Sequence, residues 1–144
     1  MSRLKIEIAG RSLKKVMLPV RITDINYGNH TGNDAIVGMI HEARMKWLYD
    51  NNYTELNVDG IGLIMSDLAL EFKNESFYGD VLEVEIFGGE LSSKSFELYY
   101  SISTVRNNTF LLIAKAKTGM VCYDYTEKKI TEMPQVLRNL ITGD

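Results

Sequence analysis

The chain has 144 residues, of which 45% are hydrophobic and 24% charged, and its 16 basic and 19 acidic side chains give a formal net charge of −3. These values predict one folded domain over residues 1–144 and exclude a disordered chain. The negative balance argues against a protein that binds nucleic acid or an anionic membrane. A single cysteine, Cys122, excludes an intramolecular disulfide, and two histidines without a Cys/His cluster give no metal-site spacing. With no signal-like or membrane-spanning run, we expect a metal-free cytoplasmic protein.

Apolar and polar residues alternate from Val16 to Thr23, and this period of two predicts a half-buried strand. Pro19 lies within it, and because proline cannot donate a backbone hydrogen bond, we expect this strand at the edge of a sheet. The following stretch, Asp24 to Asn33, is rich in glycine and asparagine and predicts a polar loop.

Between Asp34 and Asn51 the apolar residues recur at spacings of three and four, which predicts a helix. Its buried face should contain Ile36, Ile40, Ala43 and Trp47. Asp34 suits the positive end of the helix dipole, and Asn33 is the expected N-cap. Gly38, in the middle of the helix, would let a neighbour approach closely.

Beyond residue 60 the pattern is that of strands, with apolar alternation over 68–72, 82–86 and 96–102 and a longer run over 110–123. The breaks at residues 78–80, 88–89 and 107–108 are short enough for antiparallel hairpins and predict a meander. Pro134 is expected to open a short C-terminal helix that serves packing. One helix against one antiparallel sheet makes an α+β fold, whose uncovered sheet edges predict a homodimer or homotetramer.

Three motifs, in this order, resemble the hotdog-fold acyl thioesterases, the family of 4-hydroxybenzoyl-CoA thioesterase and the acyl-ACP thioesterases. The first is Val20 to Asn33, where a strand ends in an aspartate and is followed by a histidine and an asparagine. The second is His41 to Leu48, with its Glu-Ala-Arg segment, and the third runs from Leu70 to Val84, with its Gly-Asp-x-Leu hairpin. The resemblance extends roughly from residue 16 to residue 124.

The resemblance implies one long central helix wrapped by a curved antiparallel sheet, and hydrolysis of an acyl thioester carried on coenzyme A or on an acyl carrier protein. Coenzyme A or phosphopantetheine would then be part of the substrate, and no separate cofactor is expected. Two alternatives stay open: a hotdog hydratase or dehydratase of acyl thioesters, and a non-catalytic homologue that binds acyl-CoA.

The family motif maps onto Asp24, Asn26, His30 and Asn33, and implies a thioester carbonyl bound by free N–H groups at the start of the helix. Asp24 is either a base that activates water or a residue of a strand-end turn. Asn26 stands where many members have a catalytic aspartate. Because an amide cannot take a proton, we expect Asn26 to orient water or the carbonyl, or else only to form a turn. His30 is the preferred base if Asp24 is not, with a structural loop histidine as the alternative. Asn33 is expected to be the N-cap more than a catalytic group, although a cap beside the active site can serve both.

Other residues receive secondary roles. Gly32 would permit close backbone approach to the substrate, and Glu42 is a second-rank candidate base or a solvated residue. Cys122 is expected to be a small buried side chain and not a nucleophile. The acyl pocket, if these residues are not simply core, would draw on Met39, Trp47, Ile64, Met65 and Phe72.

Overall fold

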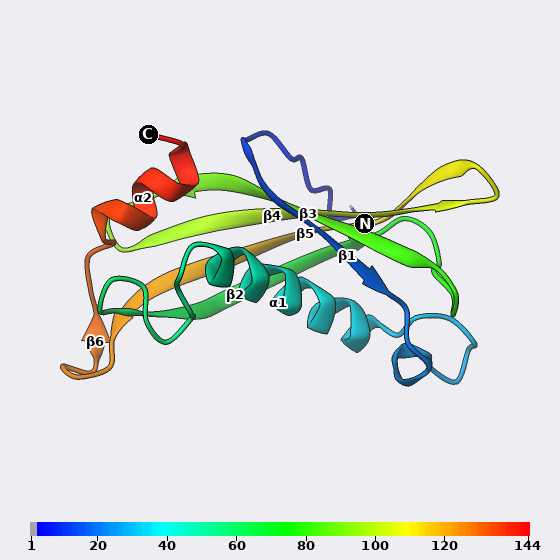
Figure 1. Cartoon of the computed structure of the whole chain (residues 1–144), viewed down its shortest axis with the longest axis horizontal. Coiled ribbons are helices and arrows are strands. Elements are labelled where there is room, and N and C mark those ends of the chain that lie inside the picture. The colour runs from blue at the N-terminus through cyan, green and yellow to red at the C-terminus, as the bar shows by residue number, and fades with distance from the viewer. Residues whose placement is uncertain (1–2) are drawn as a thin grey trace.

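The computed structural model describes residues 3–144 as an antiparallel sheet with one long helix lying along one face (Figure 1). The strands are β1 (Ser12–Pro19), β2 (Gly62–Phe72), β3 (Val81–Leu91), β4 (Ser95–Arg106), β5 (Thr109–Asp124) and β6 (Lys129–Ile130). The helices are α1 (Asn33–Asp50) and α2 (Gln135–Thr142), and a 3-10 turn covers Ile22–Asp24. The strand order is β1-β3-β4-β5-β2, with β6 paired to β5. The predicted α+β class is confirmed.

Strand β1 lies at the edge of the sheet, as Pro19 predicted, and pairs only with β3. The predicted strand extends too far, because β1 ends at Pro19 and the chain turns at Ile22–Asp24. The Asp24 carboxylate causes this turn: it accepts hydrogen bonds from the backbone N–H of Arg21 at 2.8 Å and from its guanidinium at 3.2 Å. The alternation of apolar residues therefore continues past the end of the ladder.

Strands β3, β4 and β5 form the expected meander, and the turn at Asn107 and Asn108 has positive φ angles of 52° and 61°, as a type I′ hairpin requires. Two of the predicted hairpins are wrong. Residues 78–80 do not join paired strands, because β2 pairs with β5 and β3 with β4. Gly88 and Gly89 lie within β3, at a shift in its register with β4. A Cβ at Gly89 would stand 2.8 Å from the carbonyl oxygen of Glu97, so glycine here allows close strand approach.

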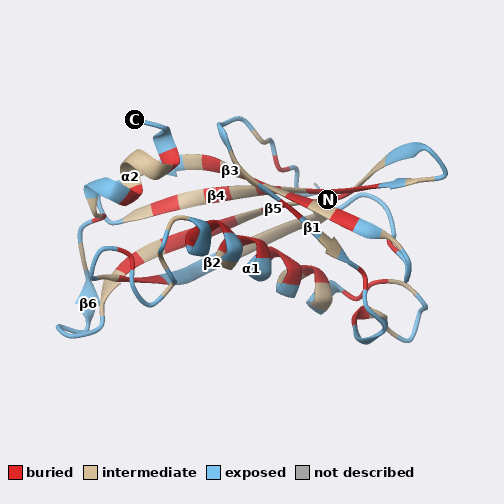
Figure 2. Ribbon diagram, viewed as in Figure 1, coloured by how far each residue is buried: buried red, intermediate tan, exposed pale blue. Residues whose placement is uncertain are grey.

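Helix α1 packs its predicted face on the inner side of the sheet (Figure 2). Its four stripe residues, Ile36, Ile40, Ala43 and Trp47, are buried. They share one core with the inward side chains of β3 and β4, which include Leu82, Val84, Ile86, Leu98 and Ile102. Gly38 is exposed, and a Cβ there would meet nothing within 4 Å. The opposite side of α1 is therefore open along the isolated chain.

Helix α2 begins directly after Pro134, as predicted, and buries Leu137 and Ile141 at one end of the sheet (Figure 1). Ile141 packs over Gly88 of β3, where a Cβ would approach its side chain to 2.9 Å. The role of this helix in packing is confirmed. Within residues 3–144, neither helix combines the length and the apolar character needed to cross a membrane.

A buried polar network connects α1 to the sheet. Arg44 of α1 is 4% exposed and donates through Nε to Glu55 Oε2 at 2.8 Å and through Nη1 to the Tyr100 hydroxyl at 3.2 Å. The Tyr100 hydroxyl in turn lies 2.7 Å from Thr118 Oγ1. Burial alone would lower the pKa of Arg44, but Tyr100 and Glu55 raise it overall, whereas burial raises the pKa of Tyr100. Arg44 is therefore a buried charged group, and its hydrogen-bond partners are side chains of the same chain.

The losses from removing two partners of this network should not add, because each single removal already leaves the other partner buried and unpaired. Glu55→Gln leaves the buried guanidinium without its carboxylate, and we expect a loss of about 2 kcal/mol in the free energy of unfolding. The double variant Arg44→Met/Glu55→Gln should lose less than the sum of the single variants. Urea denaturation measures all three. Asp50→Asn, which breaks the exposed pair with Lys14, is the control and should cost under about 1 kcal/mol. Additive losses would contradict this account.

Candidate active site

The polar loop between β1 and α1 is closed by its own backbone. Gly32 N–H donates to the carbonyl of Asp24 at 2.9 Å, and Asn26 N–H donates to the carbonyl of His30 at 3.0 Å. Asn29, at the tip, has a φ of 65°, a conformation that asparagine tolerates better than most residues. These bonds bring residues that are distant from one another along the loop to the start of α1.

The N-cap of α1 is Gly32, not Asn33 as predicted, and no side chain caps the helix. Gly32 is held in an extended conformation because its N–H is bonded to Asp24, and its carbonyl accepts the first helical hydrogen bond, from Ile36. Asn33 is consequently the first helical residue. The N–H groups of Asn33, Asp34 and Ala35 have no hydrogen-bond partner among the described residues. Three free donors at the positive end of an 18-residue helix suit a developing oxyanion.

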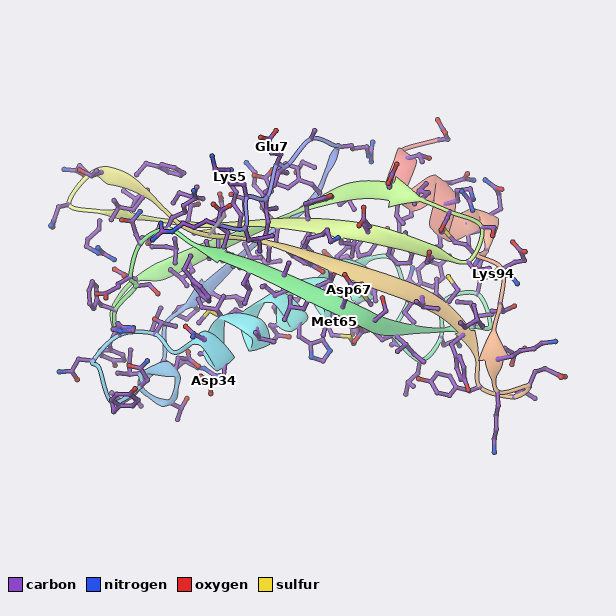
Figure 3. The ribbon with its side chains drawn as sticks, turned by 180° about the vertical axis from the view of Figure 1, so that it is seen from behind. Lys5, Glu7, Asp34, Met65, Asp67 and Lys94 are labelled. Atoms are coloured by element: carbon purple, nitrogen blue, oxygen red, sulfur yellow. The ribbon has the colours of Figure 1, made fainter. Side chains whose placement is uncertain are left out.

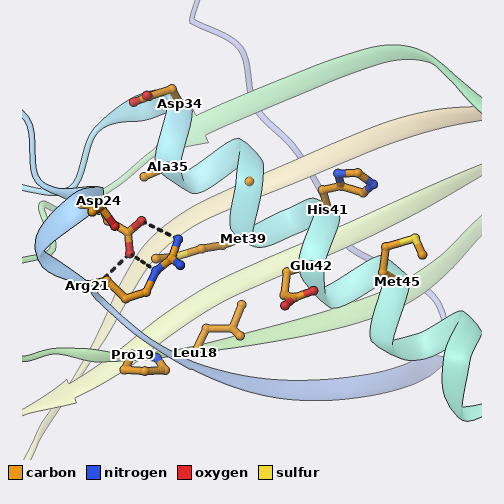
Figure 4. Close-up of a pocket in the computed structure, with 12 residues that line it drawn as sticks. Leu18, Pro19, Arg21, Asp24, Asp34, Ala35, Met39, His41, Glu42 and Met45 are labelled. Atoms are coloured by element: carbon orange, nitrogen blue, oxygen red, sulfur yellow. Dashed lines mark hydrogen bonds and ion pairs between the residues drawn. The ribbon is translucent and has the colours of Figure 1, made fainter.

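Asp24 is buried and held by Arg21, whose guanidinium and backbone N–H contact its two carboxylate oxygens (Figure 4). Its backbone carbonyl is also used, by Gly32. The carboxylate lines a cavity of about 570 Å³ that runs along α1 and faces β1. An aspartate bound in this way is well suited to fixing the loop, and less suited to taking a proton from water.

Glu42 and Met39 line the same cavity, on the side of α1 turned toward Leu18 and Pro19 of β1 (Figure 4). Glu42 is exposed, in agreement with its position off the apolar stripe. It follows Asn33 by nine residues, which corresponds to about 13 Å along a helix axis. The Glu42 carboxylate is therefore too far from the helix start to act on a carbonyl bound there within one chain.

Asn26 and His30 lie on either side of Gly28. A Cβ at Gly28 would stand 3.2 Å from His30 Nε2 and 3.3 Å from Asn26 Oδ1. Asn26 Oδ1 accepts a hydrogen bond from Gly28 N–H at 2.9 Å, while its Nδ2 donates to none of residues 3–144. His30 Nδ1 lies 3.2 Å from the carbonyl of Thr31, so in neutral imidazole Nδ1 carries the proton and Nε2 keeps the lone pair. His30 Nε2 makes no hydrogen bond within residues 3–144, and Glu75 Oε1 lies 3.9 Å from it. An amide donor and an imidazole acceptor without hydrogen-bond partners therefore lie close together beside Gly28.

Gly32 is needed for another close approach. A Cβ at this position would lie 2.6 Å from Asp34 Oδ1 and 3.6 Å from the Cβ of Asn26. The Asp34 carboxylate, near the start of α1 (Figure 3), therefore lies against Gly32, and Asn26 packs close to the same glycine. From the sequence alone, Asp34 was expected only to interact with the helix dipole, because nothing in the sequence shows that the loop folds back against this residue.

On the other side of the helix start is a smaller cavity of about 220 Å³. His30 and Asn33 line it on one side and residues 72–76, which leave the end of β2, on the other. Phe72, one of the predicted acyl-pocket residues, belongs to this cavity, as does Ser76, which sequence analysis did not single out. The free N–H groups of α1 thus stand between two cavities.

The structure separates the predicted site residues into groups. Asp24, Met39 and Glu42 line the larger cavity, whereas His30, Asn33 and Phe72 line the smaller one. Asn26 and Gly32 belong to the loop and line neither of the two cavities. Three predicted acyl-pocket residues also line neither cavity: Trp47 is fully buried in the core, and Ile64 is exposed on β2. The third, Met65, is exposed on the same strand (Figure 3).

Cys122 is buried on β5, as predicted. Burial raises the pKa of its thiol to about 11, so the thiol stays protonated near neutral pH. It therefore lacks the thiolate character of a catalytic nucleophile.

Solved structures of similar fold include three informative ones. The 1,4-dihydroxy-2-naphthoyl-CoA thioesterase from Synechocystis is 25% identical, with a TM-score of 0.77 over 88% of this chain and 93% of that one. A Pseudomonas aeruginosa protein assigned as a thioesterase is 20% identical, with a TM-score of 0.81 over 91% and 99% of the two chains. A variant of 4-hydroxybenzoyl-CoA thioesterase in complex with 4-hydroxybenzoyl-CoA is also 20% identical, with a TM-score of 0.79 over 92% and 99%. These likenesses confirm the hotdog fold.

Among curated proteins, no significant match to the sequence was found. The family model of the thioesterase-like superfamily, however, matches residues 20–141, which include the loop, α1, the sheet beyond β1 and most of α2. Because this match covers most of the chain, the protein belongs to the thioesterase-like superfamily.

Proposed function

We propose that the start of α1 is the catalytic centre at which this protein, a thioester hydrolase, cleaves acyl-CoA to a free acid and coenzyme A. The observation that carries this proposal is the set of three unpaired N–H groups of Asn33, Asp34 and Ala35, beside the free Nε2 of His30. The relatives named for 4-hydroxybenzoyl-CoA, 1,4-dihydroxy-2-naphthoyl-CoA and gentisyl-CoA support a coenzyme A thioester as the substrate. We therefore favour coenzyme A over an acyl carrier protein as the thiol carrier.

In the proposed reaction the thioester oxygen accepts hydrogen bonds from the free N–H groups of α1. His30 Nε2 takes a proton from water as the water oxygen attacks the carbonyl carbon, and the helix start stabilises the negative oxygen that forms. The carbon–sulfur bond then breaks, the proton on His30 passes to the departing thiolate, and the acid is released. Asn26, through its free Nδ2, orients the water or the carbonyl oxygen.

Asp24 is proposed as a positioning residue. Its carboxylate is bound by Arg21 and its carbonyl by Gly32, so it holds both ends of the loop that carries Asn26 and His30. We prefer His30 to Asp24 as the base because Nε2 makes no hydrogen bond and has only Glu75 Oε1 nearby, at 3.9 Å, whereas both oxygens of Asp24 accept from Arg21.

We propose a homodimer or homotetramer assembled through β2 and the open side of α1. β2 is an edge strand that exposes Ile64, Met65 and Phe72, and unpaired strand edges favour pairing with a second copy. The exposed Gly38 would let a second helix approach α1 closely. A cytoplasmic location is part of the proposal, because a single cysteine suits a reducing compartment.

The role of His30 predicts a specific loss of turnover. His30→Asn keeps a polar side chain but removes the proton acceptor, and kcat for acyl-CoA hydrolysis should fall about a hundredfold or more. Steady-state assays with a panel of acyl-CoAs measure it. His41→Asn, which changes the other histidine of the chain, is the control and should retain most of its turnover. If both variants turn over like the wild type, the base lies elsewhere and Asp34 is tested next.

Replacing Asn26 by aspartate tests which group activates water. If Asn26 orients water for His30, a second carboxylate next to Asp34 should repel the developing oxyanion and lower kcat about tenfold. Asn29→Asp makes the same chemical change at the exposed loop tip, and should have little effect. A rise in kcat for Asn26→Asp at saturating substrate would show that a carboxylate at position 26 is the better catalyst.

Acyl-CoA binding without hydrolysis by the wild type would contradict the proposed function.

A further inference from the structure

Ser76 presents a buried hydroxyl that has no hydrogen-bond partner. The residue is 2% exposed, and its Oγ is the single buried side-chain oxygen or nitrogen without a partner in the chain from residue 3 onward. A buried hydroxyl left unpaired costs about 1–3 kcal/mol. Native proteins satisfy nearly all such groups, so this one requires an explanation.

Two hydrogen bonds from Thr31 hold the backbone of Ser76 in place. Its carbonyl oxygen accepts hydrogen bonds from Thr31 N–H at 2.8 Å and from Thr31 Oγ1 at 3.1 Å. Thr31 is itself buried and immediately precedes the N-cap of α1. The fold therefore holds Ser76 firmly against the helix start, at the wall of the smaller cavity.

The smaller cavity has the shape of a pocket for one compact group. Ile36, Phe72 and Ile113 supply apolar walls, and its volume is about 220 Å³. An apolar cavity of roughly 150 Å³ is large enough to bind benzene. The cavity thus has room for one aromatic ring or a short chain.

The cavity is also continuous with the proposed catalytic centre. Asn33 lines it, and the N–H of Asn33 is one of the three free donors of α1. A thioester whose carbonyl oxygen accepts from this N–H can place its acyl group in the cavity. His30, the proposed base, stands at the same side of the cavity.

We infer that the smaller cavity receives the acyl group and that Ser76 selects acyl groups bearing a hydroxyl or another hydrogen-bonding substituent. This rests on the proposed function, since it takes the carbonyl to be bound at Asn33. The Ser76 hydroxyl both donates and accepts, so once its side chain turns toward the cavity it can pair with such a substituent in either sense. A site that hydrogen-bonds a substrate hydroxyl discriminates against the analogue that lacks it, because the polar group of the site is then left unpaired.

The test compares 3- and 4-hydroxybenzoyl-CoA with benzoyl-CoA. In Ser76→Ala, the ratio of kcat/KM for the better hydroxylated substrate to that for benzoyl-CoA should fall about tenfold or more. The matched control is Ser103→Ala, which removes the hydroxyl of a buried serine on β4 that does not line this cavity, and it should keep the wild-type ratio. An unchanged ratio in Ser76→Ala would overturn the inference.

Stability gives a second readout. Because the hydroxyl is unpaired in the free protein, Ser76→Ala should not lower the melting temperature, while hydroxybenzoyl-CoA should stabilise the wild type more than it stabilises Ser76→Ala. A lower melting temperature together with equal stabilisation by the ligand would assign Ser76 to packing alone.

If the wild type hydrolyses no acyl-CoA, the proposed function fails. Calorimetric binding of the same thioesters then decides the inference: a wild-type preference for the hydroxylated thioester that is absent in Ser76→Ala supports it, and equal preferences refute it.

Discussion

The hydrogen bond from Gly32 N–H to the carbonyl of Asp24 is the constraint on which the site depends. It joins the two ends of the loop and holds Gly32 extended, so that the helix begins at Asn33 with no side chain over its first amides. Thr31 extends the same anchoring to the segment after β2 through its bonds to the carbonyl of Ser76. A few main-chain bonds thereby bring the loop, the helix start and residues 72–76 together.

The distribution of charge around this point gives each group a distinct task. Arg21 donates to both oxygens of Asp24, which offsets the negative charge of that carboxylate near the start of α1. Asn26 brings an amide and no additional negative charge to the place where an oxyanion would form, beside the carboxylate of Asp34. His30 supplies the free lone pair. The helix start can therefore stabilise negative charge without competition from the buried aspartate.

Local periodicity was sufficient to predict the elements that surround the site, but not the contacts between them. The apolar stripe of α1 and the edge position of Pro19 are local consequences of helix geometry and of a missing N–H, and the structure confirms both. The pairing of β2 with β5 is set by long-range packing, so the spacing of residues 78–80 wrongly suggested a hairpin. Arg44 belongs to the Glu-Ala-Arg segment, but its contacts and those of Ser76 could not be predicted, because both arise from burial beside residues distant in sequence.

The central claim is that the thioester carbonyl binds at the start of α1. A crystal structure of the protein with a ketone analogue of benzoyl-CoA, in which a methylene replaces the sulfur, tests it most directly. The account predicts the carbonyl oxygen about 3 Å from the N–H of Asn33 or a neighbouring free amide, with the ring beside Phe72 and Ser76 in the smaller cavity. A carbonyl oxygen bound beside Glu42 and Met45 in the larger cavity, with the helix start unoccupied, would contradict it.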